Sequence, residues 1–377
     1  MINVLLAATS SESFSGASKC LVELAEKLQE DSEFNVVVTM PRRGDLERVL
    51  AEKKIPFHVV KEYQSWYRDE GKENKRYRLK RILNYVSVLK LMRIIRAEKI
   101  DVVHENASTA YVPALAAKIL HVPYIWHLRE FMREDLHISF TDEKYSKRLI
   151  DSASRIVAIS RPIAESWSRE IQSPIMVIHD GIPVDEYLSC IDKALNTIAI
   201  YGRIVSGKGQ LLFSQAAALL INKYHRNLRF LWAGKIEDED YYHEIVDAIQ
   251  RCGISDYCSY LGEINNVPNF LDEVGIVCVC STKEGFGRVT VESMLSSCLV
   301  VASNSGANVE IIRDKENGLI FDNTAQGLAD ALEWALNHED VCRCIVVNAR
   351  NDAKEKYSLD ADVEKIKQLY KSVNDKA

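Results

Sequence analysis

Short apolar runs alternate with amphipathic segments along nearly the whole chain, and this alternation restricts the fold more than any other feature. The runs are rich in Val and Ile, and several are apolar on both faces, as is typical of strands in a parallel sheet covered by helices. This βαβ repetition predicts a doubly wound α/β architecture. In the first half of the chain we expect strands at 2–8, 34–39, 55–60, 101–104, 123–127, 155–159 and 175–178, with helices at 17–29, 79–96 and 109–120.

The alternation stops at 180–183 and restarts after a polar stretch that ends near Asn196. We therefore expect a hinge there, between a first domain of residues 1–186 and a second of residues 190–356. The last helical segment, 360–377, has no strand after it and is free to pack back on the first domain. In the second half we expect strands at 197–201, 228–233, 259–261, 275–280 and 299–303, with helices at 210–221, 241–252 and 288–296.

The composition excludes several classes of protein. The 377-residue chain is 47% hydrophobic and 27% charged, so disorder is excluded as its main state. A formal net charge of −6 argues against nucleic acid as a partner. No uncharged apolar run approaches the roughly 18 residues of a membrane-spanning helix. The chain begins without an export signal, and its nine cysteines lack zinc spacing, so we expect a cytoplasmic protein with reduced thiols.

The segment 202–209, Gly-Arg-Ile-Val-Ser-Gly-Lys-Gly, follows an expected strand and opens a helix. It nearly matches the phosphate-binding pattern G-x-x-x-x-G-K-[ST], but Gly209 replaces the hydroxyl residue that would hold Mg²⁺, which disfavours a nucleotide triphosphatase. Arg203 and Lys208 beside a helix N-terminus suit a diphosphate, because both supply positive charge to phosphate oxygens. The alternative is an exposed basic turn.

The segment 284–292 carries two carboxylates across an expected junction from loop to helix. Gly285 and Gly287 let the backbone approach a ligand closely. Glu284 and Glu292 are eight residues apart, so they can reach two parts of one extended ligand, and carboxylates accept hydrogen bonds from sugar hydroxyls. Either Glu alone would more often be a surface or helix-start charge.

Together these motifs resemble those of glycosyltransferase family 4, the "glycosyl transferases group 1". Gly202-Arg203 followed by Lys208-Gly209 is similar to the family's G-R-x-x-x-x-K-G, and the two glutamates are similar to its E-x7-E. Segments 16–18, 179–182, 305–310 and 317–320 resemble its N-terminal glycine loop, domain boundary, small-residue turn and N-G-x-x motif. Asp180 stands where the family usually has Asn. The resemblance implies the GT-B fold, two Rossmann-like domains that face each other across a cleft.

The resemblance also implies roles for single residues. Arg203 and Lys208 would hold the diphosphate of a nucleotide-sugar, and Glu292 would bind the ribose. Glu284 would contact hydroxyls of the transferred sugar, with the amides of Phe286 and Gly287 nearby. The remaining donor-binding residues by this resemblance are Gly285 in the same loop, Gly16 near the phosphates and Ile264 beside the nucleobase.

Three further candidate residues, His127, Arg129 and Glu130, lie at or just after the end of the expected strand 123–127. A lone His such as His127 is more often a hydrogen-bonded core residue, but sites gather at strand ends, and the family often has a His facing the transferred sugar at this place. We favour a catalytic role for it, with Glu284, Arg203 and Lys208. Arg129 and Glu130 either line the acceptor side of the site or pair with each other at a surface.

The resemblance implies transfer of a sugar from a nucleotide-diphosphate-sugar to a saccharide or lipid-linked saccharide, with retention of configuration, as in bacterial surface-polysaccharide synthesis. No carboxylate pair suited to double displacement is evident. We expect neither a metal nor a cofactor, since Arg203 and Lys208 would replace the metal and the acidic run 237–240 is interpreted as a helix start. An epimerase, a phosphorylase and a non-catalytic nucleotide-sugar-binding subunit are the alternatives.

Residues 72–99 hold ten Lys or Arg residues and two Glu residues in a chain of net negative charge. Apolar residues recur among them at helical spacing, namely Leu79, Ile82, Leu83, Val86 and Leu89. An anionic membrane surface would attract such a segment, which would place the protein peripherally on the inner face of the cell membrane. The alternative is that the apolar stripe packs on the sheet and the basic residues are merely solvated.

Overall fold

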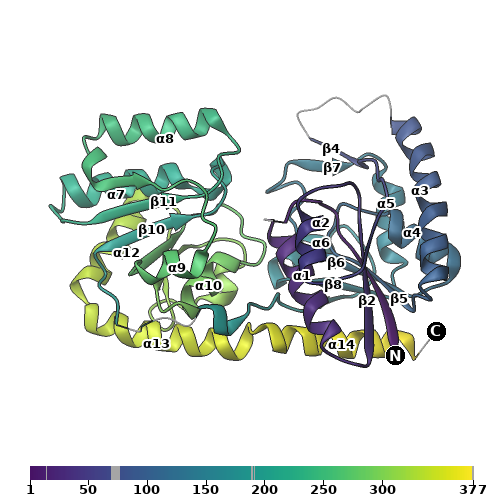
Figure 1. Ribbon diagram of the computed structural model, residues 1–377. Coiled ribbons are helices and arrows are strands. Elements are labelled where there is room, and N and C mark those ends of the chain that lie inside the picture. Colours follow the sequence, from purple (N-terminus) through teal and green to yellow (C-terminus); the bar gives the residue numbers. More distant parts are fainter. Residues whose placement is uncertain (14, 69–76, 188–189, 191, 376–377) are drawn as a thin grey trace. The chain divides into compact units, whose positions relative to one another are not determined.

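The computed structural model describes residues 1–13, 15–68, 77–187, 190 and 192–375. The chain divides into two compact units, one formed by Met1–Gly181 with Leu359–Ala377 and the other by Ile182–Ser358. Each unit is a parallel sheet packed with helices (Figure 1).

The first unit contains a seven-stranded sheet in the order β3-β2-β1-β5-β6-β8-β9, in which all neighbouring strands are parallel. Each run that the sequence indicates as a strand overlaps one of them: β1 (Ile2–Ala7), β2 (Phe34–Met40), β3 (Phe57–Val59), β5 (Val102–Glu105), β6 (Tyr124–Leu128), β8 (Arg155–Ala158) and β9 (Ile175–Val177). Two short strands that the sequence did not indicate, β4 (Trp66–Arg68) and β7 (Ile138–Phe140), pair antiparallel as a separate sheet.

The helices of the first unit are α1 (Gly16–Gln29), α2 (Leu46–Glu52), α3 (Tyr77–Ala97), α4 (Val112–Leu120), α5 (Glu143–Asp151), α6 (Arg161–Ser168) and α14 (Leu359–Asn374). Helix α4 begins later than its apolar pattern suggests, because Pro113 occupies the first turn, where its missing N–H costs nothing. The C-terminal helix α14, yellow in Figure 1, contacts α1, β1 and β5. It adds Val363, Ile366 and Tyr370 to the core formed by β1, β2 and α1.

The second unit contains a six-stranded parallel sheet in the order β12-β11-β10-β13-β14-β15. Its strands are β10 (Thr197–Tyr201), β11 (Arg229–Ala233), β12 (Cys258–Tyr260), β13 (Ile276–Val279), β14 (Leu299–Ser303) and β15 (Leu319–Phe321), and only β15 was not expected. Its α-helices are α7 (Gln210–Asn222), α8 (Glu239–Arg251), α9 (Val267–Asp272), α10 (Arg288–Leu295), α11 (Asn308–Ile311), α12 (Ala325–Asn337) and α13 (Glu339–Lys356). Alternate residues of the strands pack with apolar residues of α7, α8, α12 and α13 in one core.

Both sheets reverse their strand order once. In the second unit the chain runs from β10 outward to β12, returns to β13 on the other side of β10, and continues to β15. The first unit does the same between β1 and β5. Ligands of open α/β sheets bind outside the carboxyl ends of the strands at such a reversal, so each of the two reversals is an expected binding position.

Helix α3 departs from the expected packing. Its buried face carries Asn84 and Ser87 together with Val88, Leu91 and Ile95, whereas Leu79, Ile82, Val86 and Leu89 are exposed. The alternative that the apolar stripe packs on the sheet is therefore wrong for these four residues, and Leu83 is half-buried. Residues 72–76 of the basic segment lie outside the described residues. Nowhere in the described ranges is a helix both long enough and apolar enough to span a bilayer.

Candidate active site

The reversal between β10 and β13 brings the two main sequence motifs together. Residues 202–209 follow β10, and residues 280–287 follow β13, so both leave the sheet at adjacent carboxyl ends. The Thr282 amide donates to the Gly207 carbonyl at 3.0 Å and ties the two loops to each other. The two segments that the sequence proposed for one ligand thus form one site.

Lys208 and Glu284 form the centre of this site. The Lys208 ammonium donates to a Glu284 carboxylate oxygen at 2.9 Å, and both side chains are largely buried. Burial alone would raise the pKa of Glu284, but Lys208 and its hydrogen bond outweigh this effect and hold the pKa below its usual value. The site therefore combines an ammonium group with an ionised carboxylate, which can bind phosphate and hydroxyl groups respectively.

Two glycines hold the loops of this pair in place. Gly209 caps α7 with φ of 76°, and a Cβ there would lie 2.3 Å from the Cys280 carbonyl oxygen. This contact explains why no Ser or Thr completes the phosphate-binding pattern. Gly306 has φ of 54°, and its Cβ would lie 2.4 Å from the backbone N and O of Glu284. The turn after β14 thus packs directly against the backbone of Glu284.

Glu292 lies in α10 and is buried with two partners. One carboxylate oxygen accepts from Arg288 at 3.2 Å, and the other accepts from the Tyr201 hydroxyl at 3.1 Å. Burial first, and then the Glu292 charge, raise the pKa of Tyr201 well above its usual value, so its hydroxyl stays protonated. Sequence reasoning missed Tyr201, although a Tyr that ends the strand before Gly202 was a usable signal.

The structure also places the other residues that the sequence predicts to bind the donor. Arg203 is exposed and pairs with Glu237 at 3.0 Å, and its charge adds a smaller contribution to the low pKa of Glu284. Phe286 is buried in the loop that also contains Gly285, and Gly287 begins α10 with φ of 98°. Ile264 is half-buried in the loop after β12, two strands away from β10.

In the first unit His127 is buried in β6. Its Nδ1 lies 3.1 Å from Nε2 of His104 in β5, and the His104 Nδ1 lies 2.6 Å from the Tyr370 hydroxyl in α14. Burial first, and then the nearby Arg129 charge, lower the pKa of both histidines, that of His104 to about 3. Both rings are therefore neutral at pH 7. His127 is hydrogen-bonded in the core, yet it also lies near the carboxyl end of a central strand.

Arg129 and Glu130 do not form a surface pair, so that alternative is wrong. The Arg129 Nη1 lies 2.6 and 2.7 Å from the two carboxylate oxygens of Asp180, and both side chains are buried. Glu130 accepts from the Ser108 amide at 3.0 Å instead. The unusual Asp at position 180 thus provides a counter-charge for Arg129.

Gly16 is exposed at the first position of α1, where the Ser15 hydroxyl accepts from the Ser18 amide. A pocket of about 210 Å³ lies in the same unit, at the carboxyl ends of β1, β2 and β5. It is lined by Thr9, Pro41, Arg42, Glu62, Tyr63, Gln64, Ser65, Trp66, Thr109, Ala110, Tyr111 and Val112. An arginine, a carboxyl group and an aromatic ring in one pocket of this size suit a sugar residue.

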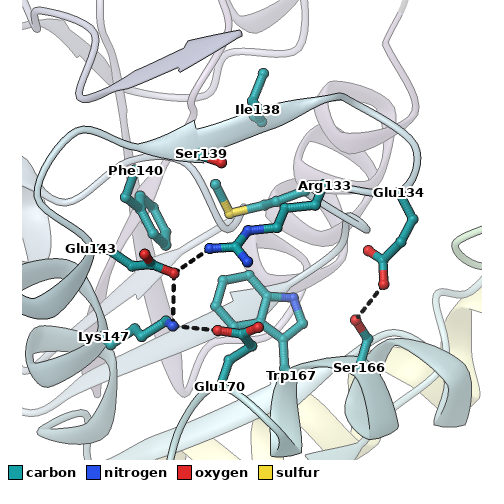
Figure 2. Close-up of a pocket in the computed structure, with 11 residues that line it drawn as sticks. Arg133, Glu134, Ile138, Ser139, Phe140, Glu143, Lys147, Ser166, Trp167 and Glu170 are labelled. Atoms are coloured by element: carbon teal, nitrogen blue, oxygen red, sulfur yellow. Dashed lines mark hydrogen bonds and ion pairs between the residues drawn. The ribbon is translucent and has the colours of Figure 1, made fainter. Parts of the chain in front are cut away.

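A smaller pocket, of about 70 Å³, lies among β7, α5 and α6 (Figure 2). Figure 2 shows that its charged groups are joined to one another, since Glu143 pairs with Arg133 and Lys147, and Lys147 also pairs with Glu170. None of the residues proposed from the sequence lines it, and we assign it no catalytic role. Within the described part of the chain, no group of three or more His, Cys, Asp or Glu side chains is placed to hold a metal ion.

Comparisons with known proteins match both halves of the chain. The family model described as Glycosyltransferase Family 4 matches residues 14–186, and the model described as Glycosyl transferases group 1 matches residues 189–352. A Campylobacter jejuni alpha-1,4-N-acetyl-D-galactosaminyltransferase, whose name specifies a diphospho-undecaprenol-linked saccharide, is 26% identical over 70% of this chain and 73% of its own. An Escherichia coli UDP-Gal:alpha-D-GlcNAc-diphosphoundecaprenol alpha-1,3-galactosyltransferase is 22% identical over 75% of this chain and 78% of its own.

Among solved structures, Anabaena HepE in complex with UDP and glucose is similar with a TM-score of 0.82 at 21% identity, covering 99% of this chain and all of that one. At this identity the likeness shows the fold, which confirms the two Rossmann-like domains of the GT-B class. With both family models matched in order and the motifs on the reversal between β10 and β13, the chain belongs to glycosyltransferase family 4 and is a glycosyltransferase.

Proposed function

We propose that this glycosyltransferase takes its sugar from a nucleoside-diphosphate sugar bound at the β10–β13 reversal. The observation that carries this proposal is the Lys208–Glu284 pair, together with the buried Glu292 in α10. Lys208 and the exposed Arg203 neutralise the diphosphate, and Glu292 accepts from the ribose hydroxyls. Glu284 accepts from hydroxyls of the transferred sugar, with the Phe286 and Gly287 amides beside it. The loop with Ile264 lies on the nucleobase side.

We propose further that transfer retains the anomeric configuration and needs no metal ion. The bond between the anomeric carbon and the diphosphate oxygen breaks, and the acceptor oxygen bonds to the same face of the sugar. The acceptor hydroxyl gives its proton to the departing diphosphate. Glu284 and Glu292 are paired with Lys208 and Arg288 and are assigned to hydroxyl and ribose contacts, so this proposal gives neither the role of nucleophile. The protein then acts by positioning the reactants and by stabilising charge on the leaving group, as Lys208 can do in place of a metal.

The acceptor in this proposal is a saccharide or a lipid-linked saccharide of bacterial surface-polysaccharide synthesis. The names of both curated relatives specify a diphosphoundecaprenol-linked sugar. The pocket that contains Arg42, Glu62 and Trp66 supplies groups that such a sugar would contact. His127 and Glu130 lie at the carboxyl edge of the same sheet, and we assign them, with Arg129, to the sugar and acceptor side.

The outer face of α3 supports peripheral attachment to an anionic membrane, where a lipid-linked acceptor is found. Leu79, Ile82, Tyr85, Val86 and Leu89 lie on one side of the helix and are 48–64% exposed. The inner side packs through Val88, Leu91 and Ile95 and is also held by Asn84, which exchanges hydrogen bonds with the Tyr63 backbone. The helix contains no acidic residue, and Lys90, Arg93 and Arg96 are exposed near its end. Apolar residues flanked by cations suit the interface of an anionic bilayer.

Vesicle cosedimentation tests this attachment. The wild-type chain should bind phosphatidylglycerol vesicles and bind phosphatidylcholine vesicles far less. Ile82→Gln with Val86→Gln should weaken binding by at least about tenfold, because two exposed apolar side chains can no longer insert. Val347→Gln, at another exposed apolar position, is the control and should bind as the wild type does. Equal binding by the Ile82/Val86 variant, or none by the wild type, would refute membrane attachment through α3.

The transfer itself is tested with a panel of nucleotide-sugars and undecaprenyl-diphosphate saccharides in the presence of EDTA. We expect one nucleotide to support transfer, and the product to show by proton NMR the anomeric configuration of the donor. Lys208→Ala and Glu284→Ala should each abolish transfer while the chain stays folded by circular dichroism. An inverted product would overturn retention, and activity that disappears with EDTA and returns with Mg²⁺ would overturn metal independence.

A further inference from the structure

Three buried side chains from distant parts of the sequence form a hydrogen-bonded chain in the first unit. The Tyr370 hydroxyl lies 2.6 Å from Nδ1 of His104, and Nε2 of His104 lies 3.1 Å from Nδ1 of His127. The three residues are at most 2% exposed. Tyr370 comes from the C-terminal helix α14, while the histidines lie on the neighbouring strands β5 and β6.

Arg129 determines which atom donates and which accepts in the hydrogen bonds between Tyr370, His104 and His127. A guanidinium group can only donate, and Nη2 of Arg129 lies 3.5 Å from Nδ1 of His127. Nδ1 of His127 is therefore an acceptor. The proton between the two rings must then sit on Nε2 of His104, which leaves Nδ1 of His104 as an acceptor for the Tyr370 hydroxyl. Because both rings are neutral, each carries one proton, and that of His127 sits on Nε2.

Of the four ring nitrogens of His104 and His127, Nε2 of His127 is the one without a hydrogen-bond partner in the described ranges. It is fully buried, and no polar atom of the described residues accepts a hydrogen bond from it. A buried N–H without an acceptor destabilises the protein, so a ligand oxygen that accepts its hydrogen bond relieves this cost. Neutral imidazole with a fixed N–H suits a hydroxyl oxygen of a sugar.

We propose that Tyr370 and His104 are positioning residues that fix His127 as a neutral Nε2–H donor toward a hydroxyl oxygen of the sugar substrate. The identity of the ligand rests on the proposed function, whereas the tautomer rests on the hydrogen bonds alone. In this arrangement helix α14 contributes to the site through a hydroxyl group that never touches the substrate.

Nitrogen-15 NMR of the histidine-labelled protein tests the tautomer without any substrate. His127→Gln and His104→Gln assign the two rings by loss of their signals. At pH 7 we expect both rings as neutral Nε2–H tautomers. Tyr370→Phe keeps the ring that packs against Phe34 but removes the donor, so His104 should shift toward the Nδ1–H form. An Nδ1–H His127 in the wild type, or ring signals unchanged in Tyr370→Phe, would overturn the proposal.

Tyr124→Phe is the matched control. Tyr124 begins β6, is also buried, and donates its hydroxyl hydrogen bond to the Leu149 carbonyl at 2.7 Å. Its loss should lower thermal stability but leave both histidine tautomers unchanged. In transfer assays Tyr370→Phe should lower kcat by about fivefold, as expected for one net hydrogen bond, with the donor KM unchanged. Expected tautomers without any transferase activity would refute the proposed function alone, and an unaltered kcat in Tyr370→Phe would overturn the positioning role.

Discussion

The ion pair between Arg129 and Asp180 gives a sharp prediction about stability. Arg129 contacts both oxygens of the Asp180 carboxylate, at 2.6 and 2.7 Å, and each side chain is 6% exposed. Removing one member leaves the other charge buried without its partner, which costs about 3–5 kcal/mol. Arg129→Met and Asp180→Asn should therefore each destabilise the first unit by about 3 kcal/mol or more.

The double variant distinguishes a true pair from two independent contributions. With both charges removed, neither is left uncompensated, so we expect the double variant to lose no more than about 3 kcal/mol rather than the sum of about 6. The coupling energy should then be at least about 3 kcal/mol. Urea unfolding followed by tryptophan fluorescence measures it, since the buried Trp126 and Trp167 both belong to the first unit.

The surface pair of Arg48 and Glu52 is the control for this cycle. Its atoms are 3.7 Å apart, and the side chains are 79% and 68% exposed. Arg48→Met with Glu52→Gln should show a coupling of less than about 0.5 kcal/mol. The reasoning about the buried pair would be refuted if its two single effects simply added, or if its coupling were as small as that of the control.

Three further predictions concern other parts of the chain. Burial raises the pKa of Asp362 to about 7 in the folded protein. The stability that its carboxyl group contributes is therefore present below the unfolded pKa and is lost as the pH rises through 7. Asp362→Asn should raise the melting temperature relative to the wild type at pH 8 but not at pH 4. Gly306→Ala removes no functional group but displaces Glu284, so calorimetry should show at least about tenfold weaker donor binding, and wild-type affinity would contradict this packing. Tyr201→Phe deprives the buried Glu292 of a donor and should weaken nucleoside diphosphate binding about fivefold, whereas unchanged affinity would separate Glu292 from the ribose.

Much of the fold could be predicted because buried parallel strands are apolar on both faces. Each expected strand formed, and the break near Asp180 separates the last strand of one sheet from the first strand of the next. Strands β4, β7 and β15 were not expected, and their length alone does not explain this, since β3, β9 and β12 are equally short and were expected. The packing of α3 was also hidden, because a buried face with Asn84 and Ser87 reverses the usual amphipathic pattern.

The candidate site was partly predictable for a different reason. Lys208 and Glu284 are recognisable because each lies in a glycine-containing loop after a strand, and the strand order then brings the loops together. The contacts around His127 and Arg129 in the first unit could not be predicted. Tyr370 and His104 are 266 positions apart, and only the return of α14 to the first unit brings them together. The sequence shows that Asp180 departs from the family pattern, but only the structure shows that it pairs with Arg129.

Calorimetric titration of nucleoside diphosphates into the full chain, in EDTA, tests the central claim most directly. We predict that one of UDP, GDP, ADP, CDP and dTDP binds. Lys208→Ala should weaken that binding by about 10- to 100-fold, because a hydrogen bond to a charged phosphate oxygen is worth about 1.5–3 kcal/mol. Lys223→Ala, at an exposed lysine of the same unit, should bind as the wild type does. Binding of none of the five, or equal affinity in Lys208→Ala, would contradict a donor site at the β10–β13 reversal.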